Sequence, residues 1–91
     1  MKGAEIQEFL EQTLFALARA AGAGVDYMEP IVLMAKLRVH RTPDKDELYF
    51  WQQTLLLRVR KERSPEGWTW TFFNADDEVI TTLFQERLKK G

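Results

Sequence analysis

The sequence predicts an α+β domain with an N-terminal helix, a three-stranded antiparallel meander and a C-terminal helix, both helices packing on one face of the sheet. Three observations support this α-β-β-β-α order. Apolar residues recur at helical spacing near the N-terminus, and they alternate with period two in the middle of the chain. The last segment begins with acidic residues and ends with basic ones, as helices prefer. We expect one domain over residues 1–91, because separate cores form only in longer chains.

The first element is an amphipathic helix over residues 4–21, followed by Gly22 and Gly24, which favour a helix end. Its apolar arc contains Ile6, Phe9, Leu10, Thr13, Leu14, Leu17 and Ala21. Phe15 lies on the other side of the helix. We therefore expect Phe15 either to be covered by another element or to face a partner.

The first strand is predicted over residues 31–40, where apolar residues alternate with others towards the end. Residues 48–61 allow two interpretations. Thr42 and Pro43 are typical of a helix start, but a strand collects more apolar side chains on one face. We favour the strand, paired with the first so that His40 lies opposite Leu48.

The third strand is predicted over residues 68–73, after a turn at residues 64–67. This hairpin places Val59 opposite Phe72 and Lys61 opposite Trp70, which keeps one apolar face through the sheet. The segment after Phe73 begins at Asn74, which can start either a hairpin turn or a helix. The charge distribution favours a helix over residues 75–89.

Composition excludes several kinds of chemistry. The chain has no cysteine and one histidine, so thiol nucleophiles, cysteine-ligated metals and histidine-based triads are excluded within one chain. It contains no glycine-rich phosphate loop, and no apolar run approaches the roughly 20 residues of a membrane span. Acidic runs at residues 44–47 and 76–78 fit loops and helix starts. We therefore expect a cytoplasmic, non-enzymatic protein without catalytic residues, metal or cofactor, and without a membrane partner.

The sheet face away from the predicted helices carries more apolar and cationic side chains than a core requires. Exposed apolar strips with aromatic, Met and Arg residues are typical of protein interfaces. The residues that we expect to contact a partner are Phe15, Met34, Arg38, Phe50 and Phe73. The residues that could contact an anion or a nucleic acid are Lys36, Arg58 and Arg60.

Charge favours the protein partner over the nucleic acid. The formal net charge is −1, although residues 36–63 contain eight basic and four acidic residues. A near-neutral chain lacks the overall attraction to phosphate on which non-specific nucleic-acid binding depends. We expect a small adaptor or regulatory domain that contacts a protein partner or itself, as a homodimer, through the outer sheet face or the first helix. The alternative is a module that binds single-stranded nucleic acid through the cationic sheet.

Two stretches carry a resemblance. Residues 57–61 (Leu-Arg-Val-Arg-Lys) and 70–80 (Trp-Thr-Phe-Phe-Asn-Ala-Asp-Asp-Glu-Val-Ile) are similar to the C-terminal sheet of RelE-like ribonuclease toxins. The resemblance implies that the alternative to protein binding, a nucleic-acid-binding module, could be a degenerate ribonuclease. The chain lacks the strongly basic character and the opening strand of that family. The element order also resembles double-stranded RNA-binding domains, but acidic residues replace their lysine-rich loop, and we assign the chain to neither family.

Overall fold

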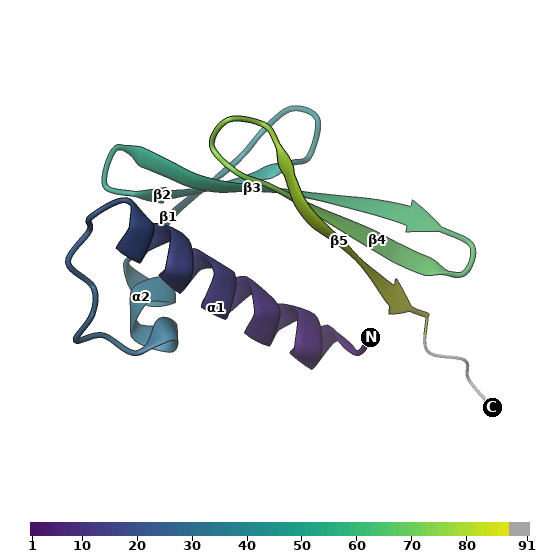
Figure 1. Cartoon of the computed structure of the whole chain (residues 1–91). Coiled ribbons are helices and arrows are strands. Elements are labelled where there is room, and N and C mark those ends of the chain that lie inside the picture. The colour runs from purple at the N-terminus through teal and green to yellow at the C-terminus, as the bar shows by residue number, and fades with distance from the viewer. Residues whose placement is uncertain (88–91) are drawn as a thin grey trace.

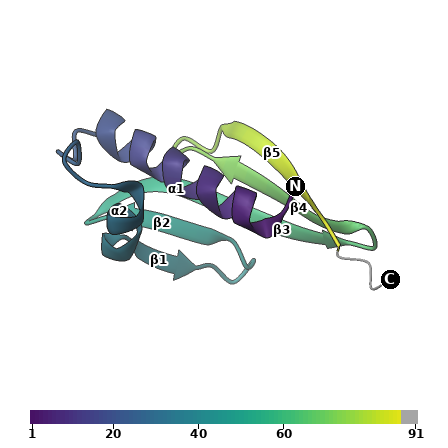
Figure 2. The same cartoon turned by 90° about the horizontal axis from the view of Figure 1, so that it is seen from below.

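The computed structural model describes residues 1–87, which form two helices and a five-stranded antiparallel sheet. The elements are α1 (Gly3–Ala20), α2 (Pro30–Lys36), β1 (Arg38–Arg41), β2 (Glu47–Trp51), β3 (Thr54–Ser64), β4 (Gly67–Phe73) and β5 (Val79–Glu86). The strands lie in the sheet in chain order, so the sheet is a meander. Both helices lie on the same side of it (Figures 1 and 2). One face is therefore covered by helices, and we call the other the open face.

The α+β class and the antiparallel sheet agree with the prediction, whereas the number of strands and the order of the helices do not. Helix α1 lies within one residue of its predicted bounds. Its buried side chains are four residues apart and form one stripe directed at the core, namely Ile6, Leu10, Leu14 and Ala18. Gly22 follows the helix with a φ of 76°, a left-handed conformation that glycine adopts without steric cost.

The predicted strand over residues 31–40 is wrong for most of its length. Residues 30–36 form helix α2, and only Arg38–Arg41 are a strand. Pro30 at the first helical position favours the helix, and Leu33 is buried while Ile31 and Val32 are exposed. Because every residue from 31 to 35 is apolar, alternation does not distinguish the two structures. The part that is a strand has the predicted register, with His40 opposite Leu48.

Residues 48–61 are extended, as predicted, but they form two strands instead of one. β2 and β3 are joined by a tight turn in which Trp51 pairs with Thr54 and Gln52 has a φ of 54°. Hairpin turns with positive φ are usually marked by Gly, Asn or Asp. The Gln52–Gln53 pair lacks this signal, which is why the sequence did not reveal the turn.

The hairpin of β3 and β4 has the predicted register, with Val59 opposite Phe72 and Lys61 opposite Trp70. At its turn, Gly67 lies so close to β5 that a Cβ atom would overlap the carbonyl oxygen of Gln85. Glycine therefore allows the edge of the sheet to close against this turn.

The predicted helix over residues 75–89 is wrong within the described residues, and residues 88 and 89 lie outside them. The chain makes a hairpin turn instead, and Val79–Glu86 form β5. Asn74 Oδ1 accepts the backbone N–H groups of Asp76 and Glu78, each at 2.9 Å. Asn74 thus caps a turn and not a helix. The β-branched run from Val79 to Thr82 then pairs with β4, whose edge would otherwise be unpaired.

The core lies between the helices and the covered face of the sheet. Its largest fully buried side chains are Phe72, Leu14, Leu33, Leu57, Val25 and Val59. The ring of Phe9 from α1 meets Phe72 edge-on, with centroids 5.2 Å apart. This contact packs α1 against β4.

Tyr49 introduces a dependence of stability on alkaline pH. Burial raises its pKa from 10.0 to about 12, and nearby Glu47 adds to the rise while Arg41 opposes it. Because the folded-state pKa exceeds the unfolded one, this contribution is complete below pH 10.0 and disappears as the pH rises towards about 12. We expect a loss of about 2–3 kcal/mol in urea unfolding over this range. Over the same pH range, the free energy of unfolding of the variant Tyr49→Phe should fall by about 2–3 kcal/mol less than that of the wild type. An equal fall in both proteins would contradict the raised pKa of Tyr49.

Candidate functional site

The open face is built around Arg58 and Arg60 of β3. Asp46, in the loop between β1 and β2, is only 3% exposed. Its two carboxylate oxygens accept hydrogen bonds from Arg60 Nε at 3.1 Å and Arg60 Nη2 at 3.2 Å. Arg58 Nε lies 3.8 Å from Asp46, and Arg58 Nη2 lies 3.3 Å from Asp77 in the loop between β4 and β5. Both loops rise above the sheet on this side (Figure 1), and Arg58 links them.

Phe73 of β4 completes this arginine cluster, which consists of Arg58, Arg60, Asp46, Asp77 and Phe73. The Arg58 guanidinium lies 4.3 Å from the centre of the Phe73 ring and that of Arg60 lies 5.4 Å from it. Phe73 is consequently only 9% exposed. The hydrogen bond to Asp46, reinforced by its charge, raises the pKa of Arg60 above its already high ordinary value. The guanidiniums are thus matched by carboxylates and an aromatic ring within the protein itself.

The structure brings together five of the eight predicted site residues. Arg58, Arg60 and Phe73 form the cluster just described, and Arg38 and Phe50 form a second pair on β1 and β2, with the guanidinium 4.8 Å from the ring centre. Register places Phe50 on the opposite side of its strand from buried Tyr49, and therefore on the open face.

The other three predicted residues lie elsewhere. Met34 and Lys36 belong to α2 on the helix side of the sheet, which follows from the error in the predicted strand. Met34 packs against the core and Lys36 is exposed. Phe15 is half-buried against the core, with the Arg19 guanidinium 5.9 Å from its ring centre. Phe15 is therefore partly covered by the protein itself, and its contact with a partner stays a prediction.

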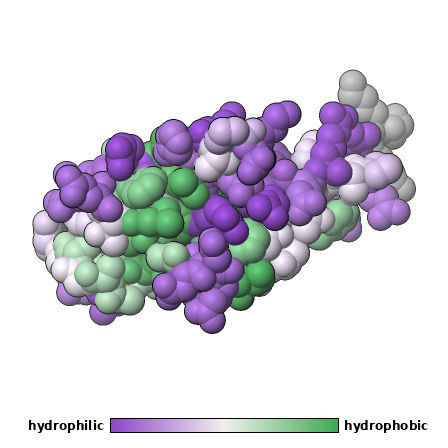
Figure 3. Space-filling model, turned by 90° about the horizontal axis from the view of Figure 1, so that it is seen from above, coloured by the Kyte–Doolittle hydropathy of each residue, from purple (hydrophilic) through white to green (hydrophobic). Residues whose placement is uncertain are grey.

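The prediction missed a group of exposed apolar residues on β5. Val79, Ile80 and Phe84 are 59%, 41% and 39% exposed. Val79 pairs with Phe73 and Phe84 pairs with Thr69, so both lie on the open face, and Ile80 is the extra residue at a bulge between these pairs. Figure 3 shows the open face, on which apolar side chains gather mainly in one part and polar ones cover most of the rest. The β-branched run from Val79 to Thr82 was the available signal, but it was assigned to a helix.

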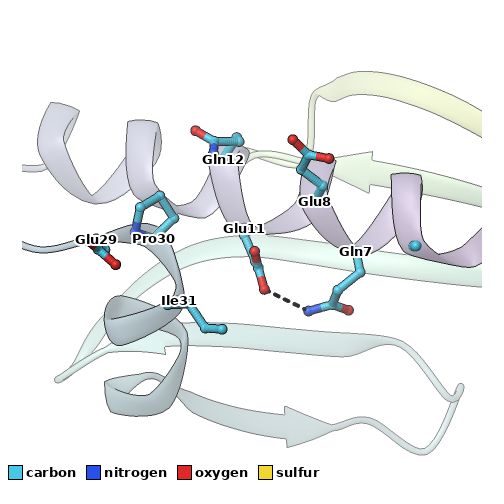
Figure 4. Close-up of a pocket in the computed structure, with 8 residues that line it drawn as sticks. Gln7, Glu8, Glu11, Gln12, Glu29, Pro30 and Ile31 are labelled. Atoms are coloured by element: carbon cyan, nitrogen blue, oxygen red, sulfur yellow. Dashed lines mark hydrogen bonds between the residues drawn. The ribbon is translucent and has the colours of Figure 1, made fainter.

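A groove on the helix side has a different character. It lies between α1 and the start of α2, has a volume of about 520 Å³ and is open to solvent. Glu8, Glu11 and Glu29 line it, and Gln7 Nε2 donates to Glu11 Oε1 at 3.5 Å (Figure 4). None of the residues lining it is basic. Within residues 1–87, no three His, Cys, Asp or Glu side chains are grouped so that they could hold a metal ion.

Neither of the two helices in the described part of the chain is long and apolar enough to cross a membrane. Comparison with models of protein families, with curated proteins and with solved structures gives no significant match for this chain. The geometry of the open face is therefore the basis for a functional proposal.

Proposed function

We propose that the chain is a small non-enzymatic protein-interaction domain, adaptor or regulatory in kind, that acts in the cytoplasm and self-associates through the open face of its sheet. The observation that carries the proposal is the group of exposed apolar side chains on β5, namely Val79, Ile80 and Phe84. Monomeric proteins rarely leave connected apolar strips in contact with water. Burying such side chains against another protein is favourable by about 25 cal/mol for each Å² removed from water.

The arginine cluster supports a protein partner over a nucleic acid. Asp46 and Asp77 already neutralise Arg58 and Arg60, and these two arginines cover the ring of Phe73. A phosphate would have to compete with a carboxylate that is hydrogen-bonded through both of its oxygens. A base would have to displace a guanidinium from the ring before it could stack there. The same pairing supports a non-enzymatic role, because these charged groups hold the face together.

The variant Phe84→Glu tests the proposal. We expect it to weaken self-association at least tenfold in light scattering over a concentration series, because in a two-fold dimer each substitution places a charge on both sides of the contact. Val32→Glu is a matched control, since Val32 is 42% exposed but lies on α2, away from the open face. Urea unfolding of both variants checks that they remain folded. A wild-type protein that stays monomeric, or equal dimerisation of wild type and Phe84→Glu, would contradict the proposal.

A further inference from the structure

We propose that the free edge of β5 pairs antiparallel with β5 of a second copy of this chain, joining two five-stranded sheets into one continuous sheet. This inference rests on the proposed function and names the partner and the strand of contact. Within residues 1–87, β5 is hydrogen-bonded to a strand on one side only. A free strand edge presents unpaired N–H and C=O groups that can pair with another chain.

The two edges of the sheet differ in how well they are protected. β1 has four residues, three of which are Arg38, His40 and Arg41. Short length and positive charge are common means of preventing edge pairing. β5 has eight residues, contains neither lysine nor proline, and carries a single charged residue, Glu86, at its end. Pairing with another chain is therefore disfavoured at the edge of β1, whereas the edge of β5 lacks this protection.

The backbone of β5 indicates which residues face the free edge. The carbonyl oxygen of Gln85 is directed at Gly67, and the N–H of Arg87 donates to the carbonyl of Glu66 at 3.0 Å. Residues 85 and 87 thus face β4 and its turn. Because backbone groups alternate along an antiparallel strand, those of Thr82 and Phe84 face the free edge. The carbonyl of Phe84 is already bonded, to the amino group of Met1 at 3.0 Å, which leaves Thr82 as the centre of the free section.

One register pairs the free backbone groups of Thr82, leaves the Phe84 carbonyl with Met1 and matches the apolar side chains. A two-fold axis perpendicular to the sheet pairs residues that lie on the same face. With Thr82 opposite the partner's Thr82, the two residues exchange both N–H···O bonds, as in the close pairs of an antiparallel ladder. Ile80 then lies opposite the partner's Phe84, and Phe84 opposite the partner's Ile80. The exposed side chains of Ile80 and Phe84 thereby cover one another across the junction.

Charge limits the length of this ladder and does not oppose its centre. In the same register, Glu86 lies opposite the partner's Glu78, so carboxylates meet at both ends of the paired section. Like charges directly opposite one another are destabilising, and they discourage pairing beyond these positions. Between them, residues 79–85 carry no charge. The strand is therefore complementary to itself in one register, which is what a closed two-fold dimer requires.

The first test compares Thr82→Pro with Thr82→Val. Proline removes the outward N–H but no bond to β4, and edge strands tolerate it at such positions. Valine keeps the N–H and the shape of the side chain. We expect light scattering to show at least a tenfold rise in the dimer Kd for Thr82→Pro and little change for Thr82→Val. Far-UV circular dichroism reports whether the proline variant is folded.

The second test does not depend on the folding of the proline variant. The chain has no cysteine, so a single introduced thiol reports one contact. Opposed residues in a hydrogen-bonded pair have Cα atoms about 5.5 Å apart, a distance that a disulfide spans. We expect Thr82→Cys to give a disulfide-linked dimer under mild oxidation. Gln53→Cys, exposed in the turn between β2 and β3, should stay largely monomeric.

The outcomes separate the two proposals. A dimer that persists in Thr82→Pro, with no more cross-linking of Thr82→Cys than of Gln53→Cys, would overturn edge pairing. If Phe84→Glu still abolishes that dimer, the proposal of contact through the open face stands and only the proposal of pairing along the β5 edge is wrong. If the wild type is monomeric at every concentration, both proposals fail. Selective cross-linking of Thr82→Cys together with dissociation of Thr82→Pro supports both.

Discussion

Replacing Phe72 with alanine should lower the free energy of unfolding by about 3–5 kcal/mol, because the substitution removes a large buried side chain and leaves a cavity. Phe72 is fully buried, lies opposite Val59 in the sheet and meets the ring of Phe9 from α1. The lost contacts therefore connect the two layers of the fold. Urea unfolding followed by circular dichroism measures the change, and such a loss would be a large share of the stability of a domain of this size.

The control for this prediction is Phe84→Ala, which makes the same substitution on the open face. Phe84 is 39% exposed, so its removal should cost less than about 1 kcal/mol when the protein is monomeric. Both unfolding experiments should therefore be run at low protein concentration. Similar losses in the two variants would mean that the core does not lie between the sheet and α1.

Replacing Asp46 with asparagine should lower the free energy of unfolding by about 2 kcal/mol, because it removes the negative charge that two arginines share. Arg58 Nε is buried and makes no hydrogen bond among the described residues. The buried carboxylate of Asp46 lies 3.8 Å from it, whereas Asp77, which lies 3.3 Å from Arg58 Nη2, is exposed to water. Of its two hydrogen bonds to residue 46, Arg60 would keep at most the one to the amide oxygen of asparagine, because the amide nitrogen donates and cannot accept. The cost is smaller than for a fully buried pair because the Arg60 side chain is 42% exposed.

Asp44→Asn is the matched control, since Asp44 is exposed and belongs to the same loop between β1 and β2. We expect it to change the free energy of unfolding by no more than about 0.5 kcal/mol. If Asp46→Asn changed the free energy of unfolding as little as Asp44→Asn does, the arginine cluster would not stabilise the fold. The interpretation of Arg58 and Arg60 as structural would then fail, and nucleic-acid binding by these residues would regain support.

Elements with strong local signals were predicted correctly. The stripe of Ile6, Leu10 and Leu14 determines both the type of α1 and the side that it buries. The turn at residues 64–67 contains Pro and Gly, and it sets the register that places Val59 opposite Phe72. In both cases the deciding residues are neighbours in the sequence, so periodicity and turn chemistry are sufficient.

Elements with ambiguous local signals were predicted incorrectly. Residues 31–35 are apolar at every position, so they fit a helix as well as a strand. The turn at Gln52 lacks the usual turn residues. Asn74 followed by acidic residues is suited to a helix start and also to a hairpin turn, and the outcome depends on whether β4 needs a partner on its outer side. Tertiary context therefore decided each of these segments.

For the candidate site, the sequence by itself determined that one sheet face would carry Arg58, Arg60 and Phe73, because alternation along β3 and β4 places them there. Only the tertiary structure decided what these residues contact. Asp46 and Asp77 are far from Arg58 in the sequence, and the fold of two loops brings them to it. The charges that suggested a phosphate site are thereby neutralised. Exposed apolar side chains lie on β5, which is the edge strand of the sheet within residues 1–87.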